Sequence, residues 1–189
     1  MKAIVFERRP AHPVTDPPLL HLVPDSALTV AGQPVFLPEL PGAWEVRAGV
    51  ALRIGRLGKG ISPKFAPRYI DGVTLALQAI PITVEAALKA DGAPTDAVWT
   101  FDGALTPGKW LPFDPEAGEL TFSLGELTRA VTAAELMTPQ CIAAVSALMT
   151  LKTGDVIVPA LCEPGLSIKA GDTLQCTFGG VDVLTYKVR

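Results

Sequence analysis

The stretch that decides the fold is Trp44–Ile54, which reads WEVRAGVALRI. Apolar residues alternate with others along it, and a period of two is typical of a strand with one buried face. Four apolar residues fall on one face: Val46, Ala48, Val50 and Leu52. Glu45 and Arg47 share the other face, because side chains two apart on a strand point the same way. At a surface this ion pair would contribute only about 0–1 kcal/mol.

Further strands are predicted on both sides of this one. The candidates are Lys2–Phe6, two short strands within 28–37 around Gly32, Gly72–Ala79, Leu120–Leu124 and Leu184–Val188. Residues 151–158 (LKTGDVIV) and 168–176 (IKAGDTLQC) share a Lys-x-Gly-Asp turn that leads into a strand. In such a turn the glycine supplies the tight bend and the aspartate caps it.

Three short helices are predicted between the strands. Ser62-Pro63 can open a helical turn over 64–69, and 83–90 (TVEAALKA) reads as a helix with Thr83 as its cap and Gly92 past its end. A third helix begins at Thr138-Pro139, where a capping hydroxyl precedes proline, and runs to about Met149. Its predicted apolar side consists of Ile142, Val145, Leu148 and Met149.

Composition limits the class of protein. The 189 residues include 17 Gly and 18 Pro, which favour turns and short strands and exclude a coiled coil, a disordered chain and a helical bundle. We predict one mainly-β domain, 25–189, with two or three short helices, preceded by a proline-rich arm over residues 1–24. Hydrophobic residues make up 49% of the chain and charged residues only 19%. Such an excess of apolar residues favours a homo-oligomer interface.

Charge, apolar runs and cysteines restrict the partners and the compartment. The net charge is −3 with no basic stripe, so nucleic acid is not expected. The longest apolar run, Cys141–Leu151, is too short for a membrane span, and Glu7 follows Ala3–Phe6 too soon for a signal peptide. Three cysteines without a CxxC pair are typical of a reduced cytoplasm.

Residue types alone point to no chemistry. The two histidines, His12 and His21, lie near prolines in the arm, and no pair of ligands has zinc-site spacing. A serine–histidine–acid triad stays open, but no serine lies in a recognisable nucleophile turn. Four aspartates adjoin a glycine, which favours a role in turns: Asp71, Asp102, Asp155 and Asp172.

The order of several segments resembles a known family. They are LLHLVPDSALTVAGQPVFL (19–37), WEVRAGVALRIG (44–55), YIDGVTLALQ (69–78), WTFDG (99–103), SALMTLKTGDVIV (146–158) and IKAGDTL (168–174). Together they resemble the fumarylacetoacetate hydrolase family over most of the chain, and the Met-Thr-Leu helix end with its Gly-Asp turn is the most specific piece. The family's arm motif would fall on Phe6–His12, where only the histidine is kept.

The resemblance implies a fold and a chemistry. The family fold is a mixed β-sandwich and roll, usually as a homodimer. Members cleave carbon–carbon bonds in β-diketo acids, or decarboxylate or tautomerise oxo-acids. They use Mg²⁺ or Ca²⁺ held by three carboxylates, and the metal polarises the oxygens of the substrate.

Carried over residue by residue, the three ligand positions fall on Glu45, Arg47 and Gln78. Their formal charge is zero where the family has −3, and a divalent cation needs anionic oxygens. The family's lysine falls on Trp99, its substrate-contacting arginine on Ile82, and its Thr-Gly-Thr-Pro loop on 159–162 (PALC), which includes Leu161. The resemblance thus leaves Glu45 as the one kept metal position and His12 as a weak catalytic candidate.

Three hypotheses follow. The first is a fumarylacetoacetate hydrolase-like protein without metal-dependent catalysis and without a cofactor, whose substrate pocket is lined by Trp99, Ile82, Leu161, Arg47 and Gln78. The second is an active hydrolase, isomerase or decarboxylase of a small oxo-acid that uses Mg²⁺ or Ca²⁺. Its rearranged site would have Asp71, Asp102 or Glu85 as carboxylates and His12 as base. The third is a structural or interaction subunit. We expect a cytoplasmic homodimer that can take a small organic acid and binds no nucleic acid or membrane.

Overall fold

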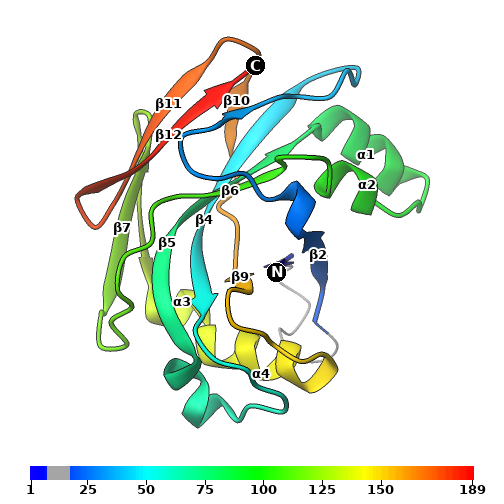
Figure 1. Ribbon diagram of the computed structural model, residues 1–189. Helices are drawn as coiled ribbons and strands as arrows, with labels where there is room; N and C mark the ends of the chain where they lie inside the picture. Colours follow the sequence, from blue (N-terminus) through cyan, green and yellow to red (C-terminus); the bar gives the residue numbers. More distant parts are fainter. Residues whose placement is uncertain (8–17) are drawn as a thin grey trace.

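The computed structural model describes residues 1–7 and 18–189, whose strands form a seven-stranded and a five-stranded sheet. The larger sheet has the order β2-β1-β9-β4-β5-β6, with β10 paired to β4. Its strands are β1 (Lys2–Phe6), β2 (Leu20–Pro24), β4 (Trp44–Ile54), β5 (Ile70–Ile80), β6 (Leu105–Pro107), β9 (Val156–Val158) and β10 (Leu166–Ile168). In Figure 1 the long strands β4 and β5 run through the middle of the molecule, and the sheet curls around them into a half-barrel.

The smaller sheet has the order β3-β12-β11-β7-β8. Its strands are β3 (Pro34–Val35), β7 (Glu119–Leu124), β8 (Leu127–Thr132), β11 (Thr173–Phe178) and β12 (Val181–Val188). Both sheets are mixed, since β1 pairs with β9 and β12 pairs with β3 in parallel while their other pairs are antiparallel. The prediction of mixed sheets with few helices is confirmed, and the sandwich-and-roll description is confirmed in part, because the larger sheet is a curled half-barrel.

Short helices connect the strands. They are α1 (Ile82–Ala90), α2 (Asp96–Trp99), α3 (Ala133–Leu136), α4 (Thr138–Leu148) and the 3-10 helices η1 (Asp25–Ala27) and η2 (Pro63–Tyr69). The three predicted helices correspond to η2, α1 and α4, and the single-turn helices α2 and α3 were not predicted. None of the helices in the described residues is long and apolar enough to cross a membrane.

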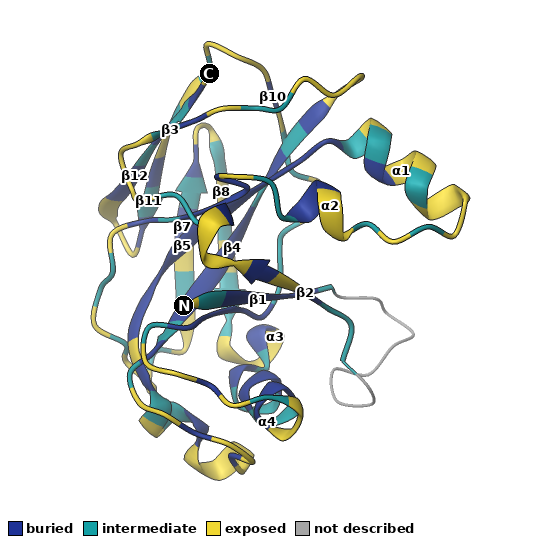
Figure 2. Cartoon of the chain, turned by 45° about the vertical axis from the view of Figure 1, so that its right-hand side comes forward, coloured by how far each residue is buried: buried dark blue, intermediate teal, exposed yellow. Residues whose placement is uncertain are grey.

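The two faces of β4 belong to two different hydrophobic clusters. Its predicted apolar face packs into the main core between the sheets, together with side chains such as Phe122 and Tyr186 of the smaller sheet. Ala51, on the other face, belongs to a second cluster with Ala76, Trp99 and Val158. Figure 2 shows the buried residues concentrated along β4 and β5. The face that carries Glu45 and Arg47 is therefore covered by other parts of the chain.

The two Lys-x-Gly-Asp turns have the predicted construction. The carboxylate of Asp155 accepts a hydrogen bond from the Lys152 amide at 2.9 Å, and Asp172 accepts one from the Lys169 amide at 2.9 Å. The glycine of each turn has a positive φ, 88° at Gly154 and 99° at Gly171. The turn role predicted for these two aspartates is therefore confirmed.

Several local predictions were wrong. Residues 28–37 contain only one two-residue strand, β3, which pairs with β12 rather than with a neighbouring strand. Thr83 lies inside α1, where its hydroxyl accepts a hydrogen bond from the Ala43 amide instead of capping the helix. Met137, with φ 48°, precedes α4 in the position predicted for Thr138, and Leu148 of the predicted apolar side is exposed. The division of the chain at residue 24 stays a prediction.

Candidate functional site

Glu45 and Arg47 lie on the same face of β4, as the alternation predicts, and they form an ion pair. The Nε of Arg47 donates to Oε1 of Glu45 at 2.8 Å, and its Nη1 donates to Oε1 of Glu163 at 2.6 Å. The amide of Gly165 donates to the same oxygen of Glu45 at 2.7 Å. One guanidinium thus links two carboxylates that come from β4 and from the segment before β10.

Burial makes this network more than a surface ion pair. The side chains of Arg47 and Glu45 are only 13% and 16% exposed, whereas that of Glu163 is 67% exposed. Burial by itself lowers the pKa of Arg47, but the hydrogen bond that Arg47 donates to Glu45 and the charges of Glu163 and Glu45 outweigh this effect. The pKa of Arg47 therefore lies above its ordinary value, and its positive charge is fixed.

Gln78 of β5 lies opposite Arg47 in the register of the two strands. Its side chain is fully buried, and its amide nitrogen donates to the backbone oxygens of Ala79 and Trp99, both at 3.2 Å. Its amide oxygen has no hydrogen-bond partner in the described part of the chain. The structure thus brings Glu45, Arg47 and Gln78 together at one place on two adjacent strands.

Trp99, at the end of α2, is the centre of a second polar group. Its indole nitrogen donates to Oε1 of Glu85 at 2.8 Å, and its ring stacks on His21 with 3.9 Å between the centroids and 8° between the planes. Lys89 continues the group, at 3.0 Å from Glu85 and 3.7 Å from Glu7. We call these five residues the Trp99 group. Glu85 is therefore bound to two partners. No role was predicted for His21, because nothing local in the sequence indicates a stacking partner 78 residues away.

The Trp99 group holds a buried histidine whose basicity is reduced. Burial lowers the pKa of His21, while the charges of Glu7, Asp96 and Glu85 raise it. Its Nε2 lies 3.5 Å from Oε2 of Glu7, and its buried Nδ1 has no hydrogen-bond partner in the residues described. At neutral pH the imidazole is thus held mainly in its uncharged form.

The apolar residues of the predicted pocket belong to the second cluster. Trp99 is 2% exposed, and Ile82 and Leu161 pack against the cluster that contains it. The loop 159–162 is fixed on β4, because the Cys162 amide donates to the Ala48 oxygen at 2.7 Å. A Cβ on Gly49 would collide with the Ala160 carbonyl and approach Cγ1 of Val158 to 2.9 Å. This close contact shows why glycine is needed at position 49.

The remaining candidates are dispersed or outside the described residues. His12 lies in the part of the chain that the structure does not describe. Asp71 is exposed and pairs with Arg53 at 2.7 Å, and Asp102 is exposed in the turn after α2. Within residues 1–7 and 18–189, no group of three or more His, Cys, Asp or Glu side chains is placed so that it could hold a metal ion.

The fold agrees with comparisons to known proteins. The family profile of fumarylacetoacetate (FAA) hydrolase C-terminal matches residues 2–189. The chain belongs to this family. It is 27% identical to oxaloacetate tautomerase YcgM of Escherichia coli (strain K12) over 180 residues, which is 91% of this chain and 82% of the relative. It is 26% identical to the mitochondrial oxaloacetate tautomerase FAHD1 of Rattus norvegicus over 183 residues, or 93% and 82%.

Solved structures confirm the family fold over the full length of the chain. Fumarylpyruvate hydrolase from Pseudomonas aeruginosa, in complex with Mn²⁺ and pyruvate, superimposes with a TM-score of 0.82 at 15% identity, covering 100% of this chain and 89% of that one. The 5-carboxymethyl-2-hydroxymuconate delta-isomerase from Mycobacterium smegmatis gives 0.81 at 24% identity, covering 99% and 78%. At these identities the likeness concerns the fold.

Proposed function

We propose that this fumarylacetoacetate hydrolase family member has lost divalent-metal-dependent catalysis on oxo- and diketo acids and keeps the family scaffold. The observation that carries the proposal is the guanidinium of Arg47, bound to Glu45 at 2.8 Å and to Glu163 at 2.6 Å. The permanent positive charge of Arg47 therefore balances the Glu45 carboxylate, which would bind a metal ion according to the family resemblance.

The residues present do not fit a divalent cation. Mg²⁺ and Ca²⁺ require oxygen ligands, mostly anionic, at close range. Glu45 offers one carboxylate, and one of its oxygens already accepts from both Arg47 and the Gly165 amide. Gln78 offers only a neutral amide oxygen, while its amide nitrogen donates to the Trp99 carbonyl. The guanidinium would also repel an ion bound beside Glu45, since it stays charged at any accessible pH.

A role as a structural or interaction subunit is the second candidate, and the burial of Trp99 in the second cluster favours it. A small organic acid would need an open space beside Trp99 and cationic or donor groups to hold its carboxylates. Trp99 is almost fully buried, and the positions of Ile82 and Leu161 supply only apolar atoms. Arg47 is a cation at this place, and both of its carboxylate partners belong to the chain itself.

Activity and metal binding can be tested together. We expect no acceleration of the keto–enol conversion of oxaloacetate, with or without Mg²⁺, Mn²⁺ or Ca²⁺, in an assay in which the E. coli relative serves as the positive control. We also expect that millimolar concentrations of these ions do not shift the thermal unfolding of the wild type. A metal-dependent stabilisation that Glu45→Ala abolishes would overturn the proposal.

A double variant shows whether the ligand positions are correctly assigned. Arg47→Glu with Gln78→Asp supplies three carboxylates, so metal at about 100 times its Kd should stabilise this variant by about 2.7 kcal/mol. The matched control is Lys59→Glu with Gln33→Asp, two exposed positions that make the same kinds of charge change. The control should gain no metal-dependent stability. Stabilisation of both variants would indicate a nonspecific effect of added negative charge.

A further inference from the structure

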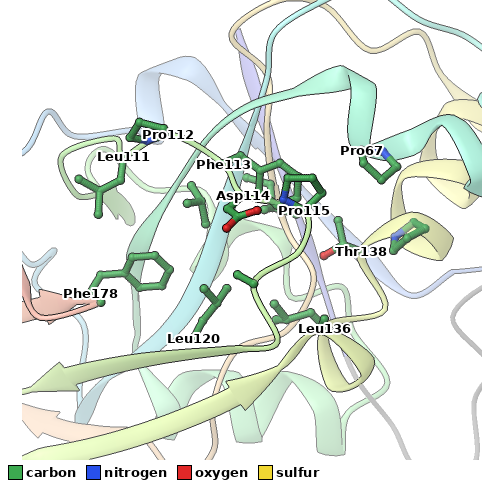
Figure 3. Close-up of a pocket in the computed structure, with 16 residues that line it drawn as sticks. Pro67, Leu111, Pro112, Phe113, Asp114, Pro115, Leu120, Leu136, Thr138 and Phe178 are labelled. Atoms are coloured by element: carbon green, nitrogen blue, oxygen red, sulfur yellow. The ribbon is translucent and has the colours of Figure 1, made fainter.

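A cavity of about 220 Å³ lies on the side of β4 that faces the main core, away from the Glu45–Arg47 pair. It is lined by η2, the segment 111–117, the junction of α3 and α4, and strands of both sheets, and it is partly open to solvent (Figure 3). Leu52 of β4 lines it, and Leu52 belongs to the opposite face of the strand from Arg47. The cavity is therefore separated from the family's metal position by the sheet itself.

Fixed elements form the walls of this cavity. Leu52 and Val73 are cross-strand partners in the larger sheet, and Phe178 adds a wall from the smaller one. The segment that covers the cavity is held to β5, because the amides of Val73 and Leu111 each donate to the other's carbonyl at 2.9 Å. The capping box between Thr132 and Glu135 fixes the start of α3. A ligand would thus enter a preformed space, which reduces the entropy lost on binding.

The size and lining of the cavity select a small apolar ring system. Its walls are mostly carbon, from side chains such as Phe113, Leu120 and Leu136. A dry apolar cavity of about 150 Å³ is known to bind benzene, which has six ring atoms. Scaled to the larger volume, this cavity holds about nine ring atoms, the size of a fused bicycle such as indole.

The polar groups at the cavity favour a cationic or donor end on such a ring. Figure 3 shows the carboxylate of Asp114 and the hydroxyl of Thr138 among the carbon side chains. Asp114 is exposed, and Glu116 and Glu119 follow it on the same segment, which carries no basic residue between 111 and 119. The nearby basic residues of η2, Lys64 and Arg68, lie over the ring of Phe65, a residue that does not line the cavity.

We propose that this cavity binds a small aromatic amine, with a fused ring in the apolar space and the ammonium group at Asp114. The site does not depend on the loss of metal catalysis, because it lies on the other face of β4. Failure of one proposal therefore leaves the other unaffected.

Three indoles that differ only in the end group test this proposal on the full chain by isothermal titration calorimetry. They are tryptamine, with an ammonium group, tryptophol, with a hydroxyl, and indole-3-acetate, with a carboxylate. We expect tryptamine to bind about tenfold more tightly than indole-3-acetate, because the exposed carboxylate attracts one and repels the other. Equal binding of all three, tighter binding of the acid, or no binding of any would overturn the proposal.

Variants then locate the binding. Asp114→Asn should reduce the affinity for tryptamine to that for tryptophol, whereas Glu126→Gln, which removes the same charge at the β7–β8 turn, should leave it unchanged. Leu120→Trp and Ala133→Trp both fill the cavity, the second from an exposed position where folding is little affected. Each should abolish tryptamine binding while thermal unfolding stays cooperative. Binding that survives both filling variants, or that Arg47→Met abolishes, would place the ligand elsewhere and refute the proposal.

Discussion

Arg47 is a charged, mostly buried side chain that is bound to two carboxylates, and it therefore sets the charge balance around Glu45. Its desolvation is offset only as long as Glu45 and Glu163 stay in contact with it. Glu45 also accepts a hydrogen bond from the Gly165 amide, which fixes the position of this carboxylate. The network also ties β4 to the segment before β10, and it therefore has a structural role whether or not the protein binds a ligand.

Removal of Arg47 should accordingly destabilise the fold. Arg47→Met leaves the 16% exposed Glu45 without its cation, and we expect the free energy of unfolding to fall by about 1–3 kcal/mol in urea titrations. Glu163→Gln changes a mostly exposed partner and should cost less than about 1 kcal/mol. Equal losses in the two variants would show that the buried pair adds nothing beyond a surface contact.

His21 makes stability depend on pH. Because burial lowers the pKa of His21 in the folded protein, the unfolded chain, with an ordinary pKa of about 6.5, takes up a proton first as the pH falls. The stability is then complete above the unfolded pKa and decreases as the pH falls below that value, about 6.5. His21→Asn should show a smaller decrease below this pH in urea titrations at each pH. The same pH dependence in the variant and the wild type would contradict a depressed pKa.

At the scale of elements, the loop 159–162 shows how closely the second face of β4 is covered. Gly49→Ala should destabilise the fold by about 1–3 kcal/mol, because the added Cβ collides with the loop. Gly72→Ala, in the paired strand β5, is the control: its Cβ would lie 3.3 Å from the guanidinium of Arg53 and 3.3 Å from the ring of Trp110, so a small shift of these side chains accommodates it. Its cost should be below about 1 kcal/mol. If chemical denaturation gives equal costs, the loop does not lie on β4 at Gly49.

Elements with a strong local pattern could be predicted, and those set by distant contacts could not. The alternation in Trp44–Ile54 gave both the bounds and the buried face of β4, since the period of two depends only on the strand itself. The two-residue strand β3 exists only through its pairing with β12, more than 140 residues further on. Likewise Glu163, which binds Arg47 from 116 residues away, has no local signal, and neither has the stacking of His21 on Trp99.

The candidate site was predictable to the extent that register and family resemblance fix it. The strand alternation places Glu45 and Arg47 on one face, and the pairing of β4 with β5 brings Gln78 opposite Arg47. The resemblance could not show that Trp99 is held by Glu85 or that Trp99 is buried, because both depend on how α1 and α2 pack. The cavity beneath Leu111–Pro115 also had no sequence signal, since its walls come from both sheets.

The whole molecule keeps the family fold across nearly its full length. We propose that it forms a homodimer, as the apolar excess predicts. Light scattering coupled to size exclusion should then give about twice the 19.9 kDa of one chain at micromolar concentration. A mass of a single chain over the whole accessible concentration range would contradict the dimer.

The loss of metal binding is tested most directly by crystals soaked in MnCl₂, with anomalous scattering measured at the manganese edge. We predict no anomalous peak within coordination distance of Glu45, and a guanidinium of Arg47 that still lies between Glu45 and Glu163. An anomalous peak on the Glu45 carboxylate, with Arg47 turned away from it, would contradict the proposal.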